Sequence, residues 1–221
     1  MDGVLRWRRN GDWGWRGGVV TATDRAVEAR LDGALRRLER LARQPEGHEI
    51  GSAAEPALSC ALQRPATLEE IAGAELRLGA ALPGDYRRFL LRSNGAMLSM
   101  LGPDDSRLVL LGTDGLVAQA EATEGALNLE CVTERVLFAA IGNEDDALAF
   151  DISRMNPYGG CAVLDARNGF RPDRWWVVAC DFTSWLTAVL REMGPSGSFG
   201  RSWAIASPQL ALPHLDDDTW D

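Results

Sequence analysis

Residues 65–95, PATLEEIAGAELRLGAALPGDYRRFLLRSNG, constrain the fold of this 221-residue chain more than any other segment. They carry the signals of two short amphipathic helices that are joined by a tight turn and closed by an Asn-Gly pair. Thr67 is placed to cap the first helix, and Glu70, three residues later, completes a capping box. Pro83 suits the first position of the second helix, where its missing N–H costs no hydrogen bond. Capping and packing account for these features, so the segment predicts structure and no chemistry.

Both predicted helices carry apolar residues near helical spacing, and arginines lie beside the stripe of the second. We expect these apolar residues to be buried against the rest of a domain. They are Leu68, Ile71, Ala72, Leu76 and Leu78 in the first helix and Tyr86, Phe89 and Leu90 in the second.

The same segment resembles the opening helices of the SUKH superfamily, which share an I…E-x-x-L-G…L-P-x-x-Y/F-x-x-F-L…N-G pattern. The resemblance extends over residues 61–194 and is weaker outside 65–95; Ala74 stands where a larger residue is common. It implies a binding domain, best known from bacterial immunity proteins that neutralise a cognate toxin. Relatives of the same fold act as non-enzymatic regulators or scaffolds. The matching positions are Ile71, Glu75, Leu78, Gly79, Leu82, Pro83, Tyr86, Phe89, Leu90, Asn94 and Gly95.

The net charge of −9 and the isoelectric point of about 4.8 give no electrostatic support for binding nucleic acid. An acidic surface favours basic protein partners by steering their approach, although acidity also serves solubility, and both interpretations stay open. All 23 basic residues are arginine. The absence of lysine excludes Schiff-base chemistry and lysine-dependent phosphate loops.

The cysteines and histidines predict neither a metal site nor a catalytic triad. The four cysteines, at positions 60, 131, 161 and 180, are scattered in apolar company without a C-x-x-C pair, so we expect buried free thiols. The two histidines, His48 and His214, have no plausible nucleophile beside them in sequence. We therefore expect a protein that is not an enzyme and needs no cofactor.

Residues 1–18 lack the apolar core of a signal peptide, and no apolar run is long enough to span a bilayer. We expect a cytoplasmic protein without membrane contact. The Arg- and Trp-rich residues 1–20 either stack on nucleic acid or fold onto the domain, and the acidic net charge favours the second interpretation.

The order of the predicted elements indicates an α+β fold, a mostly antiparallel sheet with helices packed at one face. A single apolar stripe predicts a helix from Thr23 or Asp24 to about Arg43, ahead of a linker over 44–55. The predicted domain covers 61–194, between an N-terminal arm, helix and linker over 1–60 and a tail over 195–221. Strands are predicted at 108–111, 136–141, 147–152, 161–164 and 175–179, a closing helix at 182–193, and 114–128 stays open between helix and loop.

Carboxylates between two predicted strands form the first candidate site. They match no calcium-loop spacing, so a metal site is not favoured; ordinary solvated loop residues and an acidic rim for a basic partner are the interpretations that stay open, and the rim is the candidate site. One of two consecutive tryptophans in the last strand is a candidate interface anchor, because their side chains point to opposite faces. The acidic tail is a further candidate. The predicted partner-binding residues are Glu144, Asp145, Asp146, Asp151, Trp175, Asp216, Asp217 and Asp218.

The leading hypothesis is an immunity-type protein that binds a basic toxin domain and blocks it by occlusion. A regulatory or scaffolding module is the alternative, and a carboxylate-dependent hydrolase comes third. The sequence leaves the oligomeric state, the identity of the toxin and the docking face undetermined.

Overall fold

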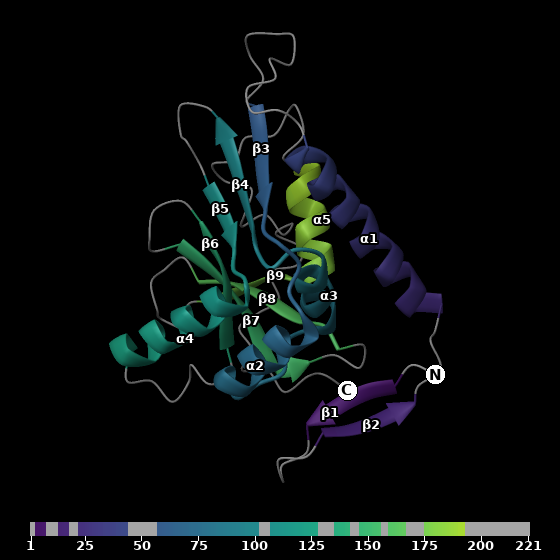
Figure 1. The fold of residues 1–221 in the computed structure, drawn as a ribbon, viewed down its shortest axis with the longest axis vertical. Helices are drawn as coiled ribbons and strands as arrows, with labels where there is room; N and C mark the ends of the chain where they lie inside the picture. Colours follow the sequence, from purple (N-terminus) through teal and green to yellow (C-terminus); the bar gives the residue numbers. More distant parts are fainter. Residues whose placement is uncertain are drawn as a thin grey trace.

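The computed structural model describes residues 3–7, 13–17, 22–43, 57–101, 107–127, 135–141, 146–155, 159–166 and 175–192. Within these residues the fold is α+β, with five helices and a seven-stranded antiparallel sheet (Figure 1). The expected fold class is confirmed. Strands β1 (Gly3–Trp7) and β2 (Trp13–Gly17) pair with each other in a separate two-stranded antiparallel sheet.

The strands of the large sheet follow one another in space in the same order as in the chain, and every neighbouring pair is antiparallel. Two helices separate the first two strands and one helix separates the third from the fourth. The strands are β3 (Ala57–Leu62), β4 (Ala96–Leu101), β5 (Arg107–Leu110), β6 (Arg135–Ile141), β7 (Asp146–Met155), β8 (Cys161–Asp165) and β9 (Trp176–Ala179).

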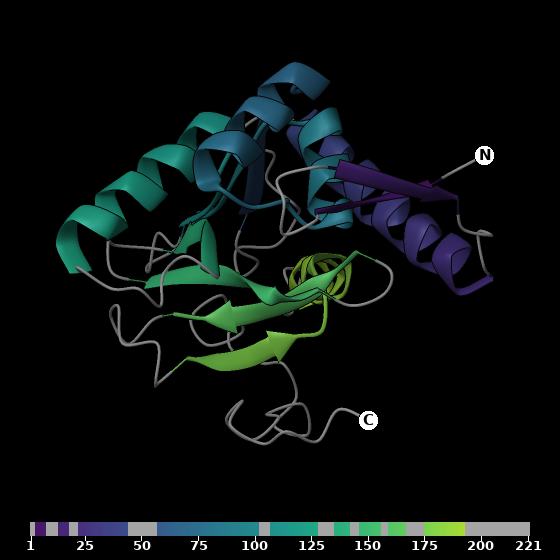
Figure 2. The same cartoon turned by 90° about the horizontal axis from the view of Figure 1, so that it is seen from below.

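The helices divide into two groups on different sides of the molecule. Helix α1 (Ala22–Ala42) packs on α5 (Phe182–Glu192) and β3, and α3 (Gly84–Arg92) contacts both of these helices. Helix α2 (Leu68–Leu78) lies along α4 (Thr113–Leu127), which also contacts β6. Figure 1 places α1 and α5 on the right and α2 and α4 at the lower left, and Figure 2 keeps α1 and α4 at opposite sides.

The main core lies between the helices and one face of the sheet. Tyr86, Phe89 and Leu90 of α3 are completely buried there, as the sequence predicts. They pack with Phe138, Phe150, Phe182 and Trp185 in one aromatic cluster. A second, smaller cluster on strands β6 to β9 comprises Leu137, Ala149, Leu164, Ala166, Trp175 and Val177.

The elements agree with the predicted helices and strands, and the structure adds to them. Residues 113–127, left open between helix and loop, form a helix, and β1, β2, β3 and β4 are strands that the sequence did not predict. Because β3 begins at Ala57, it crosses the predicted domain start at residue 61, and helix α1 packs on it. The boundaries of the domain stay a prediction.

Gly33 offers a test of helix propensity on α1. The residue is exposed in the middle of the helix, and a Cβ added there would meet no atom within 4 Å. Gly33→Ala should therefore raise the free energy of unfolding by about 0.5–1 kcal/mol, because alanine restricts the unfolded chain and favours the helix.

Urea denaturation measures this change, with Gly95→Ala as the opposite control. Gly95 has φ +111, and its added Cβ would lie 3.0 Å from the Leu110 carbonyl oxygen, so alanine should destabilise the protein there. Loss of stability in Gly33→Ala would show that α1 does not tolerate a side chain at this position.

Candidate partner-binding surface

Residues of the 65–95 segment hold elements together rather than forming a reactive site. Glu75 is buried, and its Oε1 accepts a hydrogen bond from the Leu82 amide at 2.9 Å, with Arg87 Nε at 3.6 Å. Asn94 Oδ1 accepts from the Thr113 amide at 2.7 Å, so a residue distant in sequence caps α4. These polar side chains are occupied by structural hydrogen bonds.

The predicted capping box at the start of α2 is confirmed. The Thr67 hydroxyl accepts from the Glu70 amide at 3.1 Å, and Glu70 Oε2 accepts from the Thr67 amide at 2.8 Å. Arg64 pairs with the same carboxylate, and together these hydrogen bonds lower the pKa of Glu70 to about 2. The N-terminus of α2 is thus fixed in place.

The buried thiols of Cys161 and Cys60 are poorly suited to catalysis. Burial raises the pKa of the Cys161 thiol, and the charges of Asp85, Asp151 and Asp181 raise it further, so the thiol stays protonated and is a weak nucleophile. Burial likewise raises the pKa of Cys60 to about 11. Among the described residues, no three side chains of metal-binding type come together.

The cysteines follow the prediction in part. Cys60 and Cys161 are buried free thiols, whereas Cys180 is free but exposed at the junction of β9 and α5. The apolar residues before Cys180 end with strand β9, and they do not cover the Cys180 side chain. Cys131 lies outside the described residues.

Of the residues 144–146 that form the predicted acidic rim, the structure describes only Asp146. Asp146 is the first residue of β7 and faces Ile141 of β6 in the strand register, but its side chain is not described. Glu144, Asp145 and the tail residues Asp216, Asp217 and Asp218 lie outside the described residues. Their partner-binding role stays a prediction.

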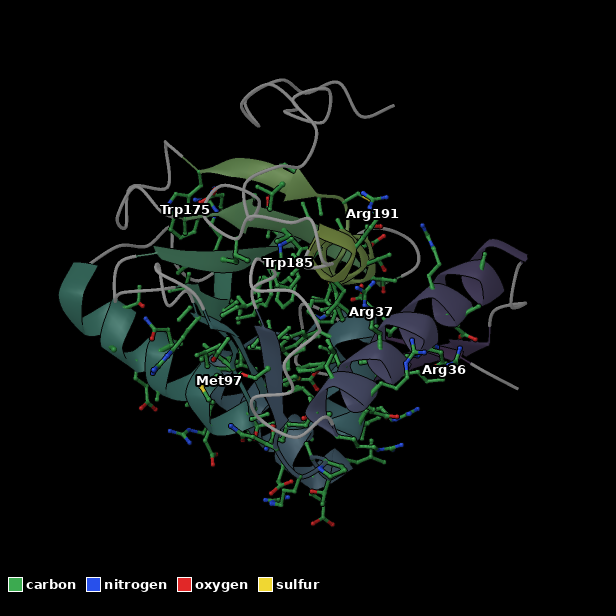
Figure 3. The ribbon with its side chains drawn as sticks, turned by 90° about the horizontal axis from the view of Figure 1, so that it is seen from above. Arg36, Arg37, Met97, Trp175, Trp185 and Arg191 are labelled. Atoms are coloured by element: carbon green, nitrogen blue, oxygen red, sulfur yellow. The ribbon has the colours of Figure 1, made fainter. Side chains whose placement is uncertain are left out.

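Asp151 and Trp175 lie inside the protein. Asp151 is 2% exposed, and Ser153 Oγ donates a hydrogen bond to its Oδ1 at 2.6 Å. Trp175 is 7% exposed in the second apolar cluster, and the Arg135 guanidinium lies 5.3 Å from the centroid of its ring (Figure 3). Both residues are therefore in contact with other parts of the chain. Their role in binding another protein stays a prediction.

Helix α2 exposes two leucines whose spacing in the sequence predicts burial. Leu68 is 64% exposed and Leu76 is 82% exposed, whereas Ile71, three residues after Leu68, is completely buried. The expectation of burial is wrong for these two leucines and for Ala72, which is also exposed, because α2 has two apolar stripes and packing covers one of them. The spacing of Leu68, Ala72 and Leu76, four residues apart each time, is the signal that marks the second stripe.

Arginines gather on the opposite group of helices. Arg36, Arg37 and Arg40 lie in the last two turns of α1, and Arg43 directly follows the helix. Arg191 lies in the last turn of the adjacent α5, and Figure 3 shows it with Arg36 and Arg37. None of the five forms an ion pair with another described residue, whereas Arg88 and Arg92 pair with Glu28 and Glu39 at 2.5 Å. The end of the α1/α5 pair is therefore a basic surface on an acidic protein.

Comparison with known families identifies the domain. The family model of the SMI1 / KNR4 family (SUKH-1) matches residues 65–188, from the segment before α2 to the second turn of α5. The chain belongs to this family. Membership in SUKH-1 is consistent with an immunity-type or a regulatory role. A comparison with curated proteins finds no match, and in the described part of the SUKH-1 chain no helix has the length and hydrophobicity needed to cross a membrane.

Proposed function

We propose that this SUKH-1 protein is an immunity-type protein that binds a cognate toxin domain in the cytoplasm. It neutralises the toxin by covering its active site and performs no reaction of its own. The observation that carries the proposal is the family match over residues 65–188. The hydrogen bonds of Glu75, Asp85 and Asn94 support it, because these buried polar groups brace the fold and leave recognition to the surface.

Electrostatics supports a basic toxin as the partner. The chain has a net charge of −9, and a surface of one sign attracts a partner of the other sign over the screening distance of about 8–10 Å. Toxins that act on nucleic acid carry basic surfaces because they bind its phosphates. When a carboxylate-rich face of the immunity protein binds this basic surface, it occupies the positions where the substrate's phosphates would bind.

A regulatory or scaffolding role is the second candidate. The basic surface at the end of α1 and α5 favours it, because a basic toxin would be repelled there and an acidic cellular partner would be attracted. The two functions predict partners of opposite charge.

Co-expression with the product of the neighbouring gene, as the candidate toxin, tests the proposed function. We expect the full chain to restore growth of cells that produce the toxin and to form a stable complex with it during size-exclusion chromatography. A chain that neither protects the cells nor binds the purified toxin domain would exclude the immunity function.

Charge reversal of the acidic residues before β7 tests their contribution to steering. Replacing Glu144, Asp145 and Asp146 together with arginine should slow association with a basic toxin about ten-fold or more at low salt and weaken its dependence on ionic strength. Stopped-flow association rates measured across a salt series, with the thermal midpoint recorded in parallel, give the readout.

The matched control reverses charge on the basic surface. Arg36→Glu with Arg40→Glu should leave the association rate unchanged or increase it, because it removes repulsion from the same partner. An unchanged rate in the 144–146 variant at low salt would remove these three residues from the docking path.

A further inference from the structure

The outer face of α2 is an apolar surface that no other described part of the chain covers. Leu68 and Leu76 are 64% and 82% exposed, and they lie about 12 Å apart along the helix axis. Between them lie the small exposed residues Ala72 and Gly73, and a Cβ added to Gly73 would meet no atom within 4 Å. The two leucines thus flank a shallow position into which a partner side chain fits.

This face is rigid before any partner arrives. The inner side of α2 is held by Ile71 and Ala74, which are buried. The capping box fixes its first turn, and Gly79, with φ 65, ends it through amide hydrogen bonds to the carbonyls of Glu75 and Leu76. A preorganised helix loses little conformational entropy on binding, so exposed leucines on it can act as anchors.

Acidic side chains border the apolar stripe. Helix α4 lies along α2, and the ion pair between Arg77 and Glu121, at 2.6 Å, joins the two exposed faces. Glu69 on α2 and Asp114 on α4 are exposed, and neither forms an ion pair with a described residue. The small residues Ala118 and Ala122 are also exposed on α4. Carboxylates outnumber guanidinium groups on this surface.

The basic surface at the end of α1 and α5 has the opposite character. Its arginines, among them Arg36, Arg37 and Arg191 in Figure 3, lie on the side of the molecule away from α2 and α4 (Figure 1). The two surfaces thus differ in charge: the end of α1 and α5 is basic, and the α2/α4 surface is acidic around an apolar stripe. A basic partner is directed to the second surface by attraction and away from the first by repulsion.

We infer that the exposed faces of α2 and α4 form the docking surface for a basic protein partner. An apolar side chain of the partner sits between Leu68 and Leu76 over Ala72 and Gly73. Its arginines or lysines face Glu69, Asp114 and Glu121. The inference rests on the proposed function, which supplies a toxin domain as the partner.

Arginine substitutions on α2 test the docking surface with the full chain and the product of the neighbouring gene as the candidate toxin. Leu76→Arg and Leu68→Arg each place a charge where the partner is apolar, and they repel its basic rim. We expect each to raise the Kd at least ten-fold, measured by isothermal titration calorimetry. The thermal midpoint should stay unchanged because both side chains are exposed in the free protein.

Ala29→Arg on α1 is the matched control. Ala29 is exposed on a helix of the other group, so the variant introduces the same side chain and the same charge away from the docking surface. It should bind with the parent's affinity within about two-fold. Glu69→Arg with Asp114→Arg should in addition slow association without changing the fold.

The possible outcomes separate the two proposals. If the parent binds the toxin and both leucine variants bind with the parent's affinity, the docking surface is overturned and the immunity function stands. If the parent does not bind, the immunity function fails and the docking surface fails with it. Weaker binding by the leucine variants alone, with Ala29→Arg unaffected, supports both.

Discussion

Tyr86→Ala should lower the free energy of unfolding by about 3–5 kcal/mol, as large-to-small changes in a fully buried site do. Tyr86 has no exposed surface, and its ring centroid lies 4.9 Å from that of Phe182, 5.0 Å from Phe150 and 5.5 Å from Phe138. Removing the ring eliminates the aromatic contacts that join α3 to α5, β6 and β7. Urea denaturation followed by tryptophan fluorescence measures the loss.

Tyr86→Phe separates the hydroxyl from the ring. The hydroxyl donates a hydrogen bond to the Leu111 carbonyl at 2.6 Å, and the Phe138 carbonyl lies 3.3 Å from the same oxygen. Burial raises the pKa of Tyr86 well above its usual range, so the hydroxyl remains a donor. Phenylalanine should cost about 1–2 kcal/mol, because it leaves the Leu111 carbonyl without this donor. A cost below 1 kcal/mol for Tyr86→Ala would show that Tyr86 does not organise the core.

Local signals explain why the helices of the 65–95 segment could be predicted. The capping box of Thr67 and Glu70 and the apolar spacing of Tyr86 and Phe89 are contained within a few residues. Such signals do not depend on the rest of the fold, so the sequence displays them directly.

Helix α4 shows where local signals fail. Its glycines and Thr123 weaken the helical pattern, yet residues 113–127 are helical. The cap comes from Asn94, nineteen residues before Thr113, and the Thr123 hydroxyl donates to the Gln119 carbonyl at 2.7 Å inside the helix. A cap supplied by a distant segment is invisible to a spacing argument.

Strands β3 and β4 were not predicted for a related reason. Their sequences, ALSCAL and AMLSML, are rich in small residues and lack the β-branched and aromatic residues that favour strands. They pair with each other across two intervening helices, in a register that joins Ala57 to Leu101. Pairing between distant segments, rather than propensity, makes them strands.

Burial of individual side chains was the least predictable property of the candidate site. Asp151 is buried although aspartate is a polar residue on a strand, and Leu76 is exposed although leucine is apolar on a helix. The sequence of α2 allows either of its stripes to face the core, and contact with α3 and α4 decides between them. Candidate partner contacts therefore had to come from the structure.

Asp85→Ala should lower the free energy of unfolding by about 3 kcal/mol, because it leaves buried donors without an acceptor. Asp85 Oδ2 accepts hydrogen bonds from the amide and the hydroxyl of Thr183, at 2.9 and 3.1 Å, and Oδ1 accepts from the Tyr86 amide at 3.0 Å. These bonds tie the first turn of α3 to the first turn of α5. Asp85→Asn keeps one acceptor oxygen and should cost less.

The parent and the Asp85→Asn variant should differ in how their stability depends on pH. Burial raises the pKa of Asp85 above its ordinary value of 3.8, and the hydrogen bonds from Thr183 only partly oppose this. Between 3.8 and the folded-state pKa, the folded protein keeps a proton that the unfolded chain has lost. The contribution of Asp85 to stability is therefore greatest below 3.8 and falls as the pH rises through the folded-state pKa.

Urea denaturation of the parent and Asp85→Asn from acidic to neutral pH isolates this contribution, since every other titrating group is common to both. The parent should lose stability relative to Asp85→Asn as the pH rises from about 4, and the difference should become constant once Asp85 is ionised in both states. A parent that gains stability relative to the variant over this range would mean that its hydrogen bonds outweigh burial. Asp85 would then be held as a carboxylate whose charge itself stabilises the contact between α3 and α5.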